Sequence, residues 1–153
     1  MVDDSDSETL VSSHSPSSIT GLHLSPSGNR CFIGTNVERA YFYSLETSPP
    51  LYLASLQATA NCCEIDWHTG LIISAGDSSE EGKDGILSLH KFSNTGGGEL
   101  KIEPILLDIQ IGKGACCLKF SQARSEVYIG YDIGVIGVVS LRELSTTLIC
   151  RFC

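Results

Sequence analysis

Apolar and polar positions alternate along this chain in three stretches that share one pattern. Each stretch contains a short apolar segment, a polar turn, a second apolar segment and a glycine. The three copies occupy residues 22–34, 64–76 and 118–130. A further apolar segment follows each copy, at residues 39–45, 85–92 and 134–141. Because side chains alternate between two faces along a β-strand, the pattern predicts three repeats of antiparallel strands.

The first repeat begins with a predicted hairpin. Along residues 19–24, Leu22 and Leu24 share one face and the intervening residues share the other, as in a half-buried strand. Residues 25–29 are rich in Pro, Ser, Gly and Asn, which predicts a turn. Residues 31–34 then return beside the first strand.

Two more strands complete this repeat, at residues 40–45 and 51–56. Tyr41 and Tyr43 are expected on the face opposite Phe42. One face of this strand is therefore expected to pack, and the other is a candidate surface for binding a partner through exposed aromatic residues. Packing between neighbouring sheets is the favoured role of these aromatic residues.

The second and third repeats follow the same plan with larger connections. Their predicted fourth strands are residues 102–111, with Pro104 tolerated at a sheet edge, and residues 148–153. Cys63, Ile65 and Trp67 are expected on one face, and Trp67 is expected in the core. Likewise, Cys116, Leu118 and Phe120 are expected to point one way. Leu24, Trp67 and Phe120 are 43 and 53 residues apart, and no segment keeps a helical apolar period over three turns.

The segments LHLSPSGNRCFIGTN and LKFSQARSEVYIGYDIG resemble the first two strands of WD40 repeats, including the turn between them. Asp132 falls where that family often has a turn aspartate, and Asn36 and Asp84 occupy comparable positions. The family's Gly-His and Trp-Asp pairs are missing. The stretch GACCLKFSQARSEVYIG is also similar to repeats of WD-repeat proteins that carry a FYVE domain.

This resemblance implies an all-β fold of three four-stranded antiparallel blades of a β-propeller. Residues 1–17 are expected to be a disordered acidic and Ser-rich leader, in which Ser15-Pro16 is a candidate phosphorylation site. The repeat region is expected to span 18–153, with blades at about 18–58, 59–112 and 113–153. Since propellers close with four to eight blades, the chain is expected to be incomplete, or to self-associate to complete a ring.

Composition and charge limit the kinds of partner that the chain is expected to bind. The chain has 153 residues, 42% of them hydrophobic, and a net charge of −8 from 10 basic and 18 acidic residues. This acidity disfavours nucleic acid and anionic membranes as partners. Apolar runs are too short for insertion into a membrane, and the acidic N-terminus does not resemble a signal peptide. A cytoplasmic location is expected, with the nucleus as the alternative.

Seven cysteines include two adjacent pairs, Cys62-Cys63 and Cys116-Cys117, at matching repeat positions. Neighbouring residues on a strand point to opposite faces, so one cysteine of each pair is expected in the core and the other against a neighbouring sheet or solvent. Zinc binding needs converging thiolates and is the less favoured alternative. Disulfides are not expected in a reducing compartment.

An enlarged turn between two strands of the second repeat carries a cluster of charged residues. The candidate partner-contact residues in this loop are Asp77, Glu80, Glu81, Lys83 and Asp84. Their spacing does not match a Ca²⁺-binding EF-hand loop. Long loops on a rigid scaffold often carry binding, and this loop is the candidate site on that ground.

No catalytic, cofactor or metal residues are assigned from the sequence. The four histidines are His14, His23, His68 and His90, and no nucleophile motif or phosphate-binding loop accompanies them. The expected function is a non-catalytic scaffold that binds other proteins. The alternatives are a fragment of a larger signalling, lipid-binding or enzymatic protein whose functional domain lies beyond Cys153, and a metal-binding β protein.

Overall fold

The computed structural model describes residues 18–36, 39–58, 60–78, 81–82, 84–95, 99–143 and 145–151. Within these ranges the regular structure consists of β-strands, with no helix and hence no helical membrane span. The strands are β1 Ile19–Leu24, β2 Arg30–Thr35, β3 Arg39–Ser44, β4 Leu51–Gln57, β5 Cys62–Asp66, β6 Leu71–Asp77, β7 Gly85–Asn94, β8 Leu100–Ile111, β9 Ala115–Ser121, β10 Glu126–Tyr131, β11 Val135–Ser140 and β12 Ser145–Arg151. The expected all-β, antiparallel class is confirmed.

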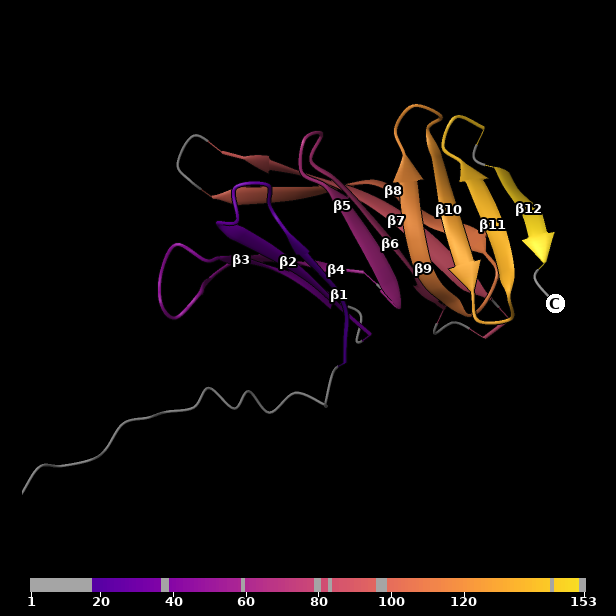
Figure 1. Cartoon of the computed structure of the whole chain (residues 1–153), viewed down its shortest axis with the longest axis horizontal. Coiled ribbons are helices and arrows are strands. Elements are labelled where there is room, and N and C mark those ends of the chain that lie inside the picture. Colours follow the sequence, from indigo (N-terminus) through magenta and orange to yellow (C-terminus); the bar gives the residue numbers. More distant parts are fainter. Residues whose placement is uncertain are drawn as a thin grey trace, which may run out of the picture.

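The strands form three sheets of four, each in sequence order. Sheet A contains β1–β4, sheet B contains β5–β8, and sheet C contains β9–β12. Every neighbouring pair within a sheet is antiparallel. Figure 1 shows the sheets following one another in chain order, in a row that does not close into a ring among the described residues.

The turn between β1 and β2 forms as its composition predicts. The Ser25 amide donates to the Arg30 carbonyl at 2.9 Å, and the Gly28 amide donates to the Ser25 carbonyl at 2.8 Å. Gly28 has a φ of 73°, a left-handed conformation that glycine adopts without steric cost. The Ser25 hydroxyl also accepts the Arg30 amide at 3.0 Å. These bonds fix the register in which His23 lies opposite Phe32.

Sheet B lies between the other two sheets, and its strands β5 and β6 pack on both faces. One face packs on sheet A through a core that includes Phe32, Phe42, Cys63, Ile72 and Phe92. The other face packs on sheet C through a second core, whose members include Cys62, Ile73, Leu87, Leu118 and Ile129. Successive residues of β5 and β6 therefore belong to different cores, as the two-residue period of a strand requires.

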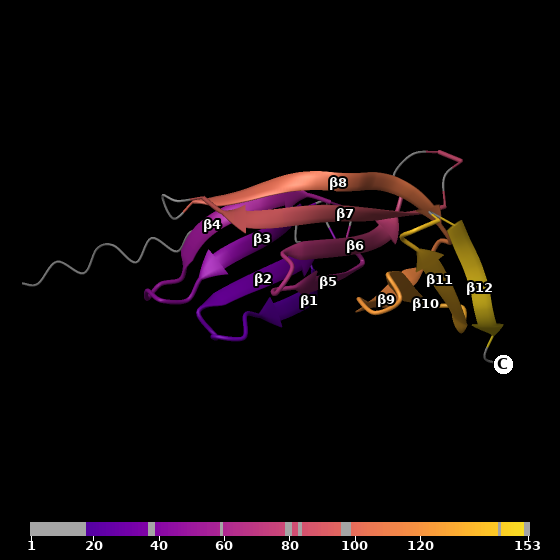
Figure 2. The same ribbon diagram turned by 90° about the horizontal axis from the view of Figure 1, so that it is seen from above.

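The first strands of the three sheets lie next to one another. β1 contacts β5, and β5 contacts β9. The long β7–β8 hairpin extends over sheet A, where β8 contacts β4 (Figure 2). Pro104 lies in β8, the edge strand of sheet B, where its missing N–H is tolerated as expected.

The aromatic residues of β3 divide between the two faces as predicted. Phe42 is fully buried, and its ring centroid lies 4.8 Å from that of Phe32 and 5.4 Å from that of Phe92. Trp67 lies in the turn after β5 and packs edge-on against Phe42, in the same core as Cys63 and Ile65. Tyr43 lies on the opposite face, against Tyr52.

The prediction for the cysteine pairs is right for one pair and wrong for the other. Cys62 and Cys63 are both buried, one in each core. Cys116 and Cys117 are both exposed. The reason is a β-bulge: Gly130 opposes Cys117, but Tyr131 opposes Ala115, which leaves Cys116 as the extra residue of β9. Ala115 and Leu118 therefore face the core, and Cys116 does not share the buried face of Leu118.

In the half-buried strand β1, the covered face is not the one that carries Leu22 and Leu24. The side of β1 that packs on sheet B carries Gly21 and His23, whereas Leu22 is 59% exposed and Leu24 is 55% exposed. Both leucines lie on the face of sheet A that points away from sheet B. The expected leader, residues 1–17, and the glycine run at 96–98 lie outside the described residues.

Candidate functional site

The acidic loop predicted from the sequence begins and ends at the junction of sheets B and C. Asp77 is the last residue of β6, and Asp84 immediately precedes β7. Glu81 is exposed in the turn between them. Glu80 and Lys83 lie outside the described residues. Two of the five predicted contact residues, Asp77 and Asp84, line one cavity at this junction.

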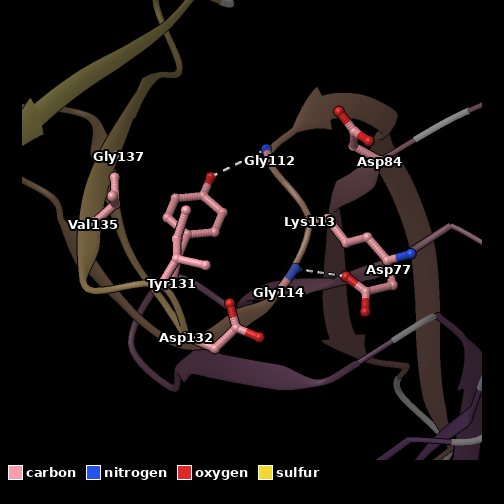
Figure 3. A pocket seen from close by; sticks show the side chains of 10 residues that line it. Asp77, Asp84, Gly112, Lys113, Gly114, Tyr131, Asp132, Val135 and Gly137 are labelled. Atoms are coloured by element: carbon pink, nitrogen blue, oxygen red, sulfur yellow. Dashed lines mark hydrogen bonds between the residues drawn. The ribbon is translucent and has the colours of Figure 1, made fainter. Parts of the chain in front are cut away.

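That cavity has a volume of about 500 Å³ and lies where the end of sheet B meets sheet C (Figure 3). It is lined by Asp77, Asp84, Gly112, Lys113, Gly114, Tyr131, Asp132, Ile133, Val135 and Gly137. Three segments supply these residues: the two ends of the acidic loop, the connection between β8 and β9, and the turn between β10 and β11. We call it the B–C pocket.

The connection between β8 and β9 is held on both sides of the pocket. The Gly114 amide donates to Asp77 Oδ1 at 2.8 Å, and the Asp132 amide donates to the Gly114 carbonyl at 2.9 Å. Gly114 has a φ of 79°, and a Cβ at this position would collide with the Asp132 carboxylate. Only glycine combines a positive φ with the absence of a Cβ, so Gly114 allows the chain to follow this path along the pocket wall.

Tyr131 forms the inner wall of the pocket. Its side chain is buried, and its hydroxyl accepts the Gly112 amide at 3.3 Å. A Cβ at Gly137 would lie 2.9 Å from the ring, so the absence of a side chain there makes room for the tyrosine. Burial raises the pKa of Tyr131, which keeps the phenol protonated and neutral at physiological pH.

The charges of the B–C pocket are mostly negative. Asp77, Asp84 and Asp132 contribute three carboxylates, and Lys113 contributes one ammonium group. Figure 3 shows the Asp132 carboxylate near Gly114, where it would meet an added Cβ. In the described residues, no group of three or more His, Cys, Asp or Glu side chains is arranged to hold a metal ion. The pocket combines an apolar wall with an acidic rim, which favours a cation on an apolar stem.

Sequence reasoning missed most of the pocket. It identified the acidic loop, and it noted Asp132 as a turn residue, but it did not join them. The signal that could have joined them is their position in the repeat. In each hairpin, a small residue near the end of the second strand pairs with the first strand: Gly34, Ala75 and Gly130. Two residues after these come Asn36, Asp77 and Asp132. Tyr131 and the Gly112–Gly114 connection carry no comparable sequence signal.

The other candidate groups lie apart from this pocket. His23 Nε2 lies 2.9 Å from the Cys63 carbonyl oxygen, to which it donates, and His68 is exposed in the turn after β5. His90 is buried on β7, and burial lowers its pKa. His14 lies outside the described residues.

The buried cysteine pair has the properties of packed thiols. Burial raises the pKa of Cys62 to about 12 and that of Cys63 to about 11. Both therefore stay protonated at neutral pH, whereas metal binding requires the thiolate.

No family model matches the chain, and no curated protein matches its sequence.

Proposed function

We propose that this chain is a non-catalytic protein–protein interaction scaffold whose three sheets are WD40-like β-propeller blades. One observation carries the proposal: each sheet is a four-stranded antiparallel meander in chain order, stacked face to face on the next. Propeller blades are four-stranded sheets arranged around a central channel. The contacts of β1 with β5 and of β5 with β9 support the assignment of these strands to the inner side of each blade.

The B–C pocket is the proposed docking site, and its occupant is a lysine or arginine side chain of a partner protein. Such a side chain has an apolar stem and a cationic end. The stem would lie against Tyr131 and Val135, and the cation would meet the carboxylates of Asp84 and Asp132, both exposed residues. Asp77 already holds the Gly114 amide, so its role is to shape the wall.

Titration with short peptides tests this site. The probe is a capped pentapeptide, Gly-Gly-Lys-Gly-Gly, followed by amide NMR of the labelled protein. We expect shifts concentrated at Gly112, Gly114 and Asp132, and loss of binding when norleucine replaces the lysine. Asp132→Asn should weaken binding about two- to fivefold, the effect of one partly exposed charge pair. Added salt should weaken it as well.

A distant variant provides the control. Glu99→Gln removes one negative charge at an exposed position outside the pocket and should leave the peptide affinity unchanged. Equal binding of the norleucine and lysine peptides would contradict the proposed site. An equal loss of peptide affinity in the Glu99 and Asp132 variants would contradict it as well, since either result would mean that the pocket does not recognise the cation.

A further inference from the structure

We propose that two copies of this chain associate by packing the outer face of sheet C of one copy onto the outer face of sheet A of the other. The outer face of sheet A carries Leu22, Leu24, Ile33, Tyr41 and Tyr43. The outer face of sheet C carries Cys117, Lys119, Tyr128, Gly130 and Ile136. The inference is independent of the B–C pocket, but it rests on the proposed propeller-blade arrangement and on what the two existing sheet junctions have in common.

The outer face of sheet A carries apolar residues at the positions that pack against a neighbouring sheet in sheets B and C. Leu22 opposes Ile33 in sheet A as Leu118 opposes Ile129 in sheet C. Leu118 is 7% exposed because it packs on sheet B. Cys63 has the same hairpin position in sheet B and packs on sheet A. Leu22 and Leu24 are thus exposed at positions whose counterparts in the other two sheets are covered by the preceding sheet.

A polar link accompanies each existing junction. His23 of β1 donates to the carbonyl of Cys63 in β5 at 2.9 Å. Glu64 of β5 accepts the amide of Phe120 in β9 at 2.9 Å. At both junctions, a side chain from the first strand of one sheet therefore hydrogen-bonds to the backbone of the first strand in the following sheet.

Lys119 occupies the corresponding position in sheet C. His23, Glu64 and Lys119 each lie two residues after the matching residues Gly21, Cys62 and Cys117. The side chain of Lys119 is 80% exposed. Its ammonium group donates to Glu64 at 3.0 Å, which leaves two of its three donors for another partner. In the proposed interface its ammonium group reaches the Leu22 carbonyl of the second copy, the counterpart of the Cys63 carbonyl that His23 meets.

The junction of sheets A and B also shows how closely the two faces approach. Gly21 and Gly34 oppose each other in sheet A, and a Cβ on either would lie 2.5 Å from Cys63 Sγ. The matching pair in sheet C is Cys117 and Gly130. Because Leu22 corresponds to Cys63, Leu22 of one copy is expected to contact Cys117 of the other.

The resulting pair would contain six sheets, within the range of four to eight that closed propellers use. The contact joins two different surfaces, so it is head-to-tail, and a pair closes only if the same contact forms twice. Closure would cover both outer faces of each copy.

Disulfide trapping tests this contact. Leu22→Cys should form a covalent dimer with native Cys117 under mild oxidation, seen as a band at twice 16.4 kDa on a non-reducing gel. Peptide mapping should locate the bond between residues 22 and 117. The Leu22→Cys, Cys117→Ser double variant should lose the band. A band that survives in the double variant, or a mapped bond between other cysteines, would overturn the proposed contact.

Light scattering of the reduced protein provides the second measurement. The unmodified chain should have the mass of two copies at high micromolar concentration, and Leu24→Asp should reduce it to one. Leu24 is already exposed, so circular dichroism should show an intact fold. Ile105→Asp, on the exposed edge of sheet B, is the matched control and should leave the dimer intact. A single-copy mass for the unmodified chain, or an open series of larger assemblies, would overturn the closed pair.

Discussion

At the scale of single residues, the junction of sheets A and B depends on the absence of two side chains. Gly21 and Gly34 leave a notch that the Cys63 thiol fills. Neither glycine has a positive φ, so their role is to provide space for the neighbouring sheet rather than an unusual backbone conformation. Thr20 adds a hydrogen bond across the same junction, since its hydroxyl donates to the Ala60 carbonyl at 2.5 Å.

Replacing the notch glycine should therefore reveal a coupling with the thiol. Gly21→Ala places a Cβ 2.5 Å from Cys63 Sγ and should destabilise the fold by about 1–3 kcal/mol, as overpacking does. Cys63→Ala removes the sulfur, so Gly21→Ala should cost much less in that background. Urea unfolding of the two single variants and the double variant measures the coupling. Additive losses would mean that the two side chains do not compete for one space.

At the scale of strands, the sequence pattern predicted the order and approximate limits of all four strands in each repeat. Two-residue alternation and turn composition carry that information locally, as the segment from Ile19 to Thr35 illustrates. The pattern could not show which face of β1 packs, because Gly21 and His23 form the covered side of this strand and leucines form the exposed one. It also missed the bulge at Cys116, since a bulge is set by pairing with β10 rather than by the local sequence.

Glu64 connects β5 to β9 by two contacts of unequal value. Its carboxylate accepts the Phe120 amide at 2.9 Å and the Lys119 ammonium at 3.0 Å. Glu64→Ala leaves the partly buried amide without its partner and should cost about 1–3 kcal/mol. Lys119→Ala removes a largely exposed ion pair and should cost about 0–1 kcal/mol. Chemical denaturation of both variants gives this ranking.

Glu64→Gln is the matched control, because the amide oxygen still accepts the Phe120 N–H. It should retain most of the stability that Glu64→Ala loses. A larger loss for Lys119→Ala than for Glu64→Ala would mean that the ion pair, and not the backbone bond, joins the two strands.

At the scale of the whole molecule, the three sheets form a linear stack with two separate cores. The core that includes Phe42 joins sheets A and B, and the core that includes Ile129 joins sheets B and C. Sequence periodicity predicted three sheets, but not the B–C pocket, because Asp77, Gly114 and Asp132 meet only when sheet B and sheet C are stacked. The sequence does show the matching positions of Asp77 and Asp132 after their hairpins, but it does not show that both meet Gly114.

A stack with nearest-neighbour contacts should open from whichever end is weakened. Phe42→Ala removes a fully buried ring and Ile129→Ala removes a fully buried aliphatic side chain, each costing about 2–5 kcal/mol. Hydrogen exchange followed by mass spectrometry should show faster exchange in β1–β4 for Phe42→Ala, with β9–β11 still protected. Ile129→Ala should show the reverse. Equal acceleration in all three sheets for both variants would mean that the stack opens as one cooperative unit, because each core would then depend on the other through sheet B.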